Sequence, residues 1–337
     1  MQWETYAKKF RKAAEAQNKS DAQVSSWLSY AQKLFDANLP IIYEQTHFSQ
    51  LLGIDNEYLH RMSNAPQHFY RTFYIEKSNV KKRKIDEPLP DLKKIQTWIL
   101  EEILYKIPCS KYAKAYIPKT SIRDNVRFHK KQEIVLTLDV KDFFPSIKSG
   151  RILNIFLTIG YNLPVAVLLT RLTCLNESLP QGAPTSAYLS NLVLKLFDER
   201  LKLYCFDRKI RYTRYADDLT FSGDFKITSL LNEVDNELKV LSMKRNYKKF
   251  NVMRKGCRQI VTGIVVNEKQ QLPKQYRMQI RQEVHYIQKF GIDSHLQHIG
   301  ENRCNYLSHL QGKIGYALFI NPQDIKMKEY LMFIQQL

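Results

Sequence analysis

Residues 133–140 read EIVLTLDV, a run in which β-branched residues and leucines fill almost every position before Asp139. Such a run is typical of a strand that is buried on both faces. Residues 209–222 contain two further strand-like runs, separated by the acidic sequence YADD at 215–218, which predicts a hairpin with a tight turn. Together these segments predict a small sheet with acidic residues crowded at one edge.

Outside these strands the pattern is mainly helical. Leu92–Ile107 carries an apolar stripe at helical spacing, and Gln259–Val266 is a β-branched run that predicts one more strand. Helices are also predicted over residues 1–65, 185–202, 224–242 and from 273 to 337, with breaks near Gly291 and Asn321-Pro322. A few strands with helices packed around them predict an α+β fold.

The composition is that of a folded, strongly basic protein. Of its 337 residues, 44% are hydrophobic and 25% are charged, which excludes a disordered or collagen-like chain. The 52 Lys and Arg residues against 33 Asp and Glu residues give a net charge of +19. Basic residues cluster over 77–84, 244–258 and 274–281, which favours nucleic acid as the partner over a membrane surface or other anions.

Cysteine usage and hydropathy predict a cytoplasmic protein. The five cysteines are widely spaced and form no C-x-x-C pair, which argues against a disulfide framework and against a zinc ribbon. The first residues lack the basic and apolar regions of a secretory signal. The most apolar run, near Leu163–Thr170, is far shorter than the roughly 20 residues that a membrane span needs.

Asp139, Asp217 and Asp218 are the candidate catalytic residues. Taken singly each has an ordinary explanation, because an aspartate after a strand often caps a helix and paired aspartates are common in turns. If neighbouring strands bring Asp139 beside Asp217, however, the crowded charges require a hard divalent cation such as Mg²⁺. Two cations held by shared carboxylates suit in-line phosphoryl displacement. With the basic clusters, this pattern points to nucleotidyl transfer on nucleic acid.

Three segments resemble motifs A, B and C of reverse transcriptases, in the right order and at suitable separations. They are LDVKDFFPSI at 138–147, LPQGAPTS at 179–186 and YADD at 215–218. The resemblance covers about residues 39–322 and includes a segment similar to the bacterial fingers, Arg83-Lys84-Ile85, and a segment similar to motif D, Asn246 with Lys249.

Within that family the chain is most similar to the retron group. Val261-Thr262-Gly263 matches a V-T-G triplet that this group carries early in the thumb. Residues 125–129, NVRFH, resemble its N-A-x-x-H segment, with Val126 where the group has alanine.

The resemblance implies a right-hand polymerase architecture, in which a small antiparallel palm sheet bears the carboxylates beside fingers and a helical thumb. The implied divisions are a helical N-terminal region over 1–65, fingers over 66–138, a palm over 139–258 with a fingers insertion near 148–180, and a thumb with C-terminal RNA-recognition helices over 259–337.

The resemblance also implies a role for individual residues. Asp139, Asp217 and Asp218 would hold two Mg²⁺ ions, with the Val140 carbonyl as a further ligand. Phe144 would lie beneath the incoming sugar and exclude a 2′-hydroxyl, unless it is a plain core aromatic. The other nucleotide contacts would be made by Arg83, Gln181 and Lys249, and contacts to RNA or DNA by Lys81, Lys82, Asn125, His129, Arg277 and Arg281.

The implied function is an RNA-directed DNA polymerase that copies a cognate structured non-coding RNA, using dNTPs, into branched multicopy single-stranded DNA. Antiphage defence with an effector protein would be its context. Two alternatives stay open: another defence-associated bacterial reverse transcriptase with a different template or primer, and a catalytically inactive RNA-binding scaffold. Val126 and the N-terminal extension keep the first alternative open, whereas the three carboxylates and Gln181 disfavour the second.

Overall fold

The computed structural model describes residues 2–78, 81–301 and 305–337. The chain divides into two compact units, each built from three segments of sequence. Unit 1 comprises Met1–Lys119, Val140–Arg200 and Asn236–Lys244, and unit 2 comprises Thr120–Asp139, Leu201–Asp235 and Arg245–Leu337.

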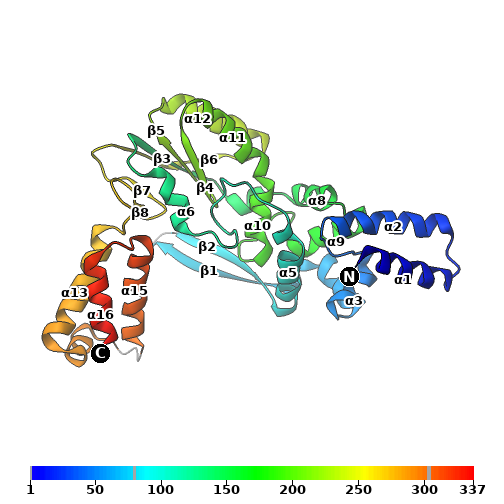
Figure 1. The fold of residues 1–337 in the computed structure, drawn as a ribbon, viewed down its shortest axis with the longest axis horizontal. Coiled ribbons are helices and arrows are strands. Elements are labelled where there is room, and N and C mark those ends of the chain that lie inside the picture. Colours follow the sequence, from blue (N-terminus) through cyan, green and yellow to red (C-terminus); the bar gives the residue numbers. More distant parts are fainter. Residues whose placement is uncertain (1, 79–80, 302–304) are drawn as a thin grey trace. The chain divides into compact units, whose positions relative to one another are not determined.

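Unit 1 is mainly helical and carries one strand hairpin (Figure 1). Its elements are α1 (Trp3–Glu15), α2 (Asp21–Asp36), α3 (Gln45–Leu52), α4 (Asn56–Asn64), the 3-10 turn η1 (Pro66–Phe69), β1 (Tyr70–Ser78), β2 (Lys81–Pro88), α5 (Pro90–Glu102), η2 (Leu104–Lys106), α7 (Phe143–Ser146), α8 (Ser149–Thr158), α9 (Leu163–Thr173) and α10 (Pro184–Val193). The helices predicted before residue 65 and after Leu92 are confirmed, although α5 ends at Glu102 rather than Ile107.

Local sequence explains where several of these helices begin. Ser20 and Gln23 form a capping box at the start of α2. Asp55 accepts a hydrogen bond from the Tyr58 amide (2.8 Å) at the start of α4, and Asn162 caps α9 in the same way. Trp3, at the start of α1, packs its ring 5.5 Å from that of Phe35, so the first two helices form an aromatic-lined hairpin.

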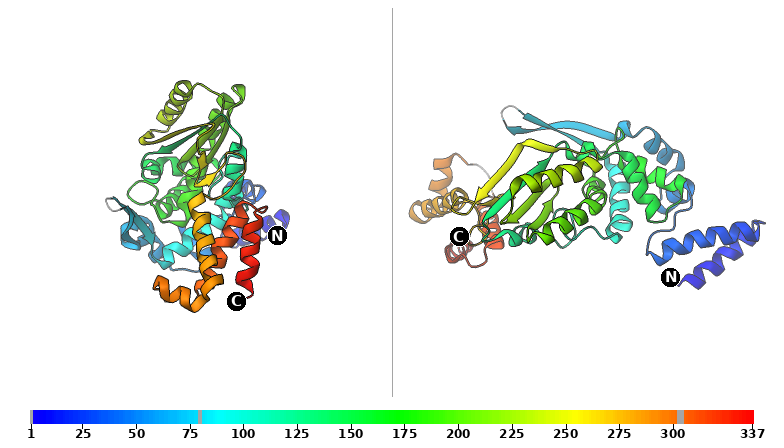
Figure 2. Two further views of the ribbon diagram at one scale, coloured as in Figure 1. Left: turned by 90° about the vertical axis from the view of Figure 1, so that its left-hand side faces the viewer. Right: turned by 90° about the horizontal axis from the view of Figure 1, so that it is seen from above.

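The β1–β2 hairpin was not predicted. Its strands pair antiparallel from Tyr70 opposite Pro88 to Ser78 opposite Lys81, and they run side by side in both views of Figure 2. Most of the described side chains in the hairpin are exposed, so it lacks the apolar alternation by which strands are recognised.

Unit 2 contains a four-stranded sheet in the order β4-β5-β3-β6. The strands are β3 (Ile134–Val140), β4 (Arg211–Tyr215), β5 (Asp218–Gly223) and β6 (Arg245–Arg254). The predicted buried strand and acidic hairpin are therefore confirmed, whereas β6 was not predicted. β6 lies at an edge and is mostly exposed, and its basic residues discourage pairing with another chain.

The two faces of this sheet differ in polarity. Register places Asp139 opposite Asp218, Thr137 opposite Thr220 and Val135 opposite Ser222, so these residues share one face, which is polar apart from the buried Val135. The alternate residues of the same strands point to the other face and are apolar and buried, namely Leu136, Leu138, Leu219 and Phe221. The acidic residues thus stand at one end of a polar face.

The remaining elements of unit 2 are helical apart from one small hairpin. They are α6 (Ile122–Val126), the 3-10 turn η3 (Arg127–His129), β7 (Ile260–Val261), β8 (Ile264–Val265), α13 (Lys274–Phe290), α14 (Ile292–Ile299), α15 (Tyr306–Ile320) and α16 (Ile325–Gln335); α11 (Lys195–Asp207) and α12 (Ile227–Val240) each contribute residues to both units. The C-terminal helices are confirmed with their predicted breaks.

The prediction of a single strand over Gln259–Val266 is wrong, because this segment forms the two short strands β7 and β8. Val261 pairs with Ile264, and Thr262 and Gly263 form a two-residue turn with φ angles of 45° and 83°. A threonine-glycine pair supplies the left-handed turn that a two-residue hairpin requires. Val261 and Ile264 then join the apolar core of the C-terminal helices, with Val284, Leu310 and Ile314 among its fully buried members.

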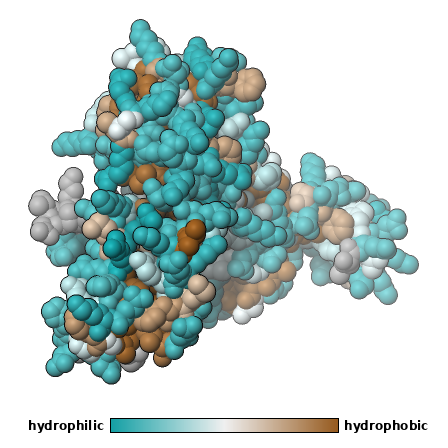
Figure 3. Space-filling model, turned by 60° about the vertical axis from the view of Figure 1, so that its left-hand side comes forward, coloured by the Kyte–Doolittle hydropathy of each residue, from teal (hydrophilic) through white to brown (hydrophobic). Residues whose placement is uncertain are grey.

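The surface is mainly hydrophilic in the view of Figure 3, with hydrophobic side chains in small patches. Among the described residues, no helix has both the length and the apolar character that crossing a membrane requires. Cys174, Cys205 and Cys257 form no disulfide bond.

Candidate active site

The β4–β5 hairpin presents two of the three candidate carboxylates. Tyr215 pairs with Asp218, so Ala216 and Asp217 alone make the turn. Ala216 has a φ of 57°, a conformation that costs a non-glycine residue about 1–2 kcal/mol. The fully buried Arg214 donates from Nη1 to the Ala216 carbonyl (3.2 Å), which supports this strained turn.

Asp139 completes the carboxylate row from β3. It is the register partner of Asp218 and is only 6% exposed. Asn246 Nδ2 donates to Asp139 Oδ1 (2.9 Å), and the Lys249 ammonium forms an ion pair with Asp139 Oδ2. Both partners come from β6, the strand next to β3. The groups that hold Asp139 are therefore supplied by a strand that was not predicted from the sequence.

The three carboxylates together favour the protonated form of Lys249. Its partial burial disfavours the charged amine, but the hydrogen bond with Asp139 and the negative charges of Asp139, Asp217 and Asp218 outweigh this effect and raise the pKa of Lys249. The lysine therefore remains protonated and acts as a counter-charge for all three aspartates.

The donor chemistry of this row fits a hard divalent cation. Carboxylate oxygens are the ligands that Mg²⁺ prefers, and Asp139 and Asp218 lie side by side. In the described residues, no three His, Cys, Asp or Glu side chains are gathered in an arrangement that would hold a metal ion. Both side-chain oxygens of Asp139 accept hydrogen bonds from the protein, Oδ1 from Asn246 and Oδ2 from Lys249.

Unit 1 brings together two of the residues expected to contact the nucleotide, Arg83 and Gln181, whereas Lys249 belongs to unit 2. Lys82, Arg83 and Lys84 of β2 line a hollow of about 440 Å³ together with Pro145 and Gln181. Strand β2 also contacts the second motif directly, because the Asp86 amide donates to the Gln181 carbonyl (2.8 Å). Lys81 lies in β2, but its side chain falls outside the described residues.

Gly182 permits this close approach. It has a φ of 133°, and a Cβ atom there would lie 2.7 Å from the Asp86 carbonyl oxygen. Any side chain at this position would strain the backbone of residue 182 and would push the second motif away from β2. The glycine of the second motif therefore sets the distance between Gln181 and the basic strand.

The two phenylalanines after Asp139 differ in environment. Phe143 is 5% exposed and belongs to the core, while Phe144 is half-buried. Their ring centroids lie 5.2 Å apart at an interplanar angle of 66°. Of the two side chains, Phe144 is the more exposed. Val140, between Asp139 and this pair, is buried.

Of the expected RNA or DNA contacts, those in α13 are accessible. Arg277 and Arg281 line a basic hollow of about 190 Å³ with Lys274, Lys326 and Tyr330. Arg277 also forms an ion pair with Asp324 (2.9 Å), which anchors α13 to the start of α16.

Asn125 and His129 differ from expectation. We expected both to contact RNA or DNA, but both side chains are fully buried. His129 contacts the hydroxyls of Ser222 (2.7 Å) and Thr213 (2.8 Å), and Asn125 accepts from Thr213 (2.6 Å). Such burial leaves neither side chain a surface for nucleic acid.

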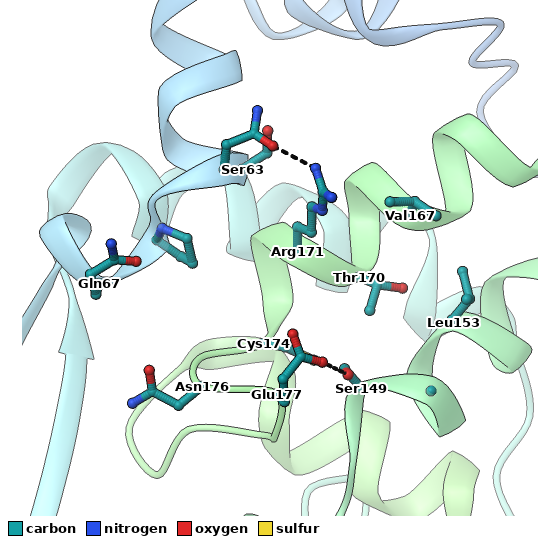
Figure 4. Close-up of a pocket in the computed structure, with 13 residues that line it drawn as sticks. Ser63, Gln67, Ser149, Leu153, Val167, Thr170, Arg171, Cys174, Asn176 and Glu177 are labelled. Carbon is teal, nitrogen blue, oxygen red and sulfur yellow. Dashed lines mark hydrogen bonds between the residues drawn. The ribbon is translucent and has the colours of Figure 1, made fainter.

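A further cavity of about 470 Å³ lies in unit 1 and is lined by both polar and apolar side chains (Figure 4). Arg171 donates to the Asn64 side chain (2.5 Å), and the Ser149 hydroxyl donates to the Glu177 carboxylate. These bonds satisfy the charged groups of the cavity within the protein.

The sequence analysis assigned no role to Arg214, which supports the acidic turn. The available signal was an arginine inside a predicted strand, between Tyr212 and Tyr215, because a charge buried there must find partners in the interior.

Comparison with known proteins identifies the family of this site. The family model of reverse transcriptases (RNA-dependent DNA polymerases) matches residues 75–309. Retron Ec86 reverse transcriptase of Escherichia coli is 30% identical over 272 residues, which cover 79% of this chain and 85% of that protein.

Two further relatives agree. Retron Mx65 reverse transcriptase of Myxococcus xanthus is 31% identical over 300 residues, covering 81% of this chain and 66% of that protein. Retron Se72 reverse transcriptase of Salmonella heidelberg is 28% identical over 294 residues, covering 82% and 77% respectively.

Proposed function

This chain belongs to the reverse transcriptase family, in its retron group, and on that basis we propose that it copies a cognate structured non-coding RNA into branched single-stranded DNA. The enzyme class, an RNA-directed DNA polymerase, follows from the family. The RNA, the branch, a role in antiphage defence and an effector protein as partner are the further content of the proposal.

The observation that carries the proposal is the pairing of Asp139 with Asp218, next to the Asp217 turn. We propose that Asp139, Asp217, Asp218 and the Val140 carbonyl hold Mg²⁺. The ions would lower the pKa of the attacking hydroxyl and neutralise charge on the departing phosphate. For Asp139 to serve, Lys249 must release it, and the freed ammonium is then available to donate a proton to departing pyrophosphate.

The residues of unit 1 suit nucleotide binding. Arg83, in a basic hollow, offers a planar fork for a triphosphate, and Gln181 offers an amide to a base or sugar. Phe144 offers a ring face that would exclude a 2′-hydroxyl. In unit 2, the basic hollow at Arg277 and Arg281 suits a phosphate backbone, and we assign these helices to the thumb and the four-stranded sheet to the palm.

The test is to purify the protein from its host and to sequence the RNA and DNA that copurify, with and without debranching enzyme. We expect one structured RNA joined to DNA whose 5′ end becomes accessible only after debranching. Linear DNA with a free 5′ end would remove the branched product and favour another type of template or primer. Absence of any copied DNA would favour an RNA-binding scaffold.

A further inference from the structure

A buried chain of hydrogen bonds crosses the polar face of the unit 2 sheet. It runs from Thr262 to Asn125 (3.3 Å), from Asn125 to Thr213 (2.6 Å), from Thr213 to His129 (2.8 Å) and from His129 to Ser222 (2.7 Å). Asn125, His129, Thr213 and Ser222 are each no more than 1% exposed. Because none of these four reaches the surface, direct contact with a substrate does not explain them.

The direction of each hydrogen bond follows from the chemistry of the groups. The Asn125 carbonyl oxygen only accepts, so the single hydroxyl proton of Thr213 points to it. Thr213 must then accept from His129 Nε2. Full burial favours the neutral imidazole, in which Nδ1 is then unprotonated and accepts from the Ser222 hydroxyl. His129 is therefore a neutral imidazole in one defined tautomer, and every group of the chain is satisfied.

This chain bridges both strands of the catalytic hairpin. Thr213 lies on β4 and pairs with Thr220, whereas Ser222 lies two residues further along β5. The two nitrogens of His129 thus contact the strands diagonally across the hairpin, and such a contact is lost if one strand slides past the other. A slip of one residue would turn Asp218 to the opposite face of the sheet.

The chain is also close to the carboxylates along the strand. Thr213 is two residues before Tyr215, the register partner of Asp218, so it occupies the next row of the same face. Two residues of a strand span about 7 Å. Contacts in this row therefore hold β4 and β5 in place next to Asp217 and Asp218, on the side away from the turn.

The other end of the chain reaches a strained turn. Thr262 has a φ of 45°, which is an outlier for a β-branched residue, and its hydroxyl accepts from Asn125. The same amide side chain thus holds the β7–β8 turn and, through Thr213, the catalytic hairpin. Figure 1 shows α6, which carries Asn125, beside the strands of this sheet.

From these contacts we infer that Asn125 and His129 are positioning residues: they set the register of the β4–β5 hairpin and so the location of Asp217 and Asp218. The inference rests on the proposed function, since it assigns these residues to the polymerase site. It replaces the contact with nucleic acid that the sequence led us to expect.

The test uses Thr213→Val in the full-length protein, because valine keeps the shape and strand preference of threonine but removes the hydroxyl that joins Asn125 to His129. We expect kcat for DNA synthesis on a primed RNA template to fall about 10–100-fold, as a small displacement of catalytic groups would cause. KM for dNTP and the Kd for RNA should be unchanged. Thr213→Ser restores the hydroxyl and should restore kcat.

Thr220→Val is the matched control, because Thr220 lies opposite Thr213 but outside the hydrogen-bonded chain. It should leave kcat unchanged. The inference is overturned if Thr213→Val retains wild-type kcat. It is equally overturned if kcat, RNA binding and melting temperature fall together and Thr213→Ser restores none of them. Failure of the wild-type protein to copy RNA would instead refute the proposed function.

Discussion

Removing a single negative charge at the acidic turn should abolish catalysis and leave RNA binding intact. Asp217→Asn or Asp218→Asn keeps side-chain size and removes the charge that the cations require. We expect DNA synthesis with Mg²⁺ to be abolished and RNA affinity to stay within about twofold, as measured by primer extension and by filter binding. Asp142→Asn is the control, because Asp142 is exposed, and asparagine tolerates its φ of 46°. Near wild-type extension by either variant of the pair would refute the metal-site assignment.

The two adjacent rings should give opposite results. Phe144→Ala is expected to raise the use of ribonucleotides relative to deoxynucleotides, because removing a steric clash needs no new attraction. Phe143→Ala should leave this ratio unchanged and reduce the free energy of unfolding by about 3–5 kcal/mol, since the ring is buried. The measurements are kcat/KM for both substrates and urea unfolding. If the two variants exchange these effects, the assignment of the two rings is off by one residue.

The buried imidazole gives stability a pH dependence. Burial, with a smaller effect from Arg211, lowers the pKa of His129 to about 3, against about 6.5 in an unfolded chain. The unfolded state therefore binds the proton more readily, so this contribution is fully present above about pH 6.5 and is lost progressively as the pH falls toward 3. The difference in melting temperature between wild type and His129→Gln should shrink over that window. A constant difference from pH 7 to pH 4 would contradict the assignment.

At the scale of elements, the contact between β2 and the second motif depends on one glycine. Gly182→Ala places a Cβ atom 2.7 Å from the Asp86 carbonyl oxygen in a backbone with a φ of 133°. We expect a loss of about 1–3 kcal/mol in the free energy of unfolding, measured in urea, together with a higher KM for dNTP. Gly150→Ala, where no heavy atom lies within 4 Å of the new Cβ, should be neutral or slightly stabilising.

Elements with a strong apolar period or defined turn chemistry could be predicted from the sequence. β3 and the acidic hairpin belong to this class, because their side chains are buried and their turn is short. β1, β2 and β6 could not be predicted, because they are largely exposed and rich in charge, so their side chains carry no burial pattern. Pairing partners, rather than hydrophobicity, specify them.

The candidate site divides in the same way. Spacing and resemblance together pointed to Asp139, Asp217, Asp218 and Gln181, whose chemistry is visible in the residue type. They did not reveal that His129 is buried or that Arg214 supports the turn, because burial depends on which elements cover the sheet. Long-range packing of α6 and η3 against β4 decides the environment of Asn125 and His129.

At the scale of the whole molecule, the net charge of +19 predicts salt-dependent RNA binding. Each phosphate contact releases counterions, so log K should fall linearly with log salt concentration. Arg281→Gln in the α13 hollow should reduce the slope by about 1. Glu329→Gln, a change on the neighbouring α16 that removes a negative charge, serves as the control and should not reduce it. An unchanged slope for Arg281→Gln would exclude a phosphate contact there.

The interleaving of the two units has a consequence for biosynthesis. Unit 1 needs Asn236–Lys244 and unit 2 needs Arg245–Leu337 before either has all of its segments. At typical rates of translation, the first 119 residues would wait roughly 6–25 s for the last segment of unit 1 to be made. During that interval the nascent chain exposes surfaces that later segments will cover. We therefore expect production in cells to depend on chaperones that hold the early segments, and chains split near residue 120 or 200 to recover activity only when both fragments are made together.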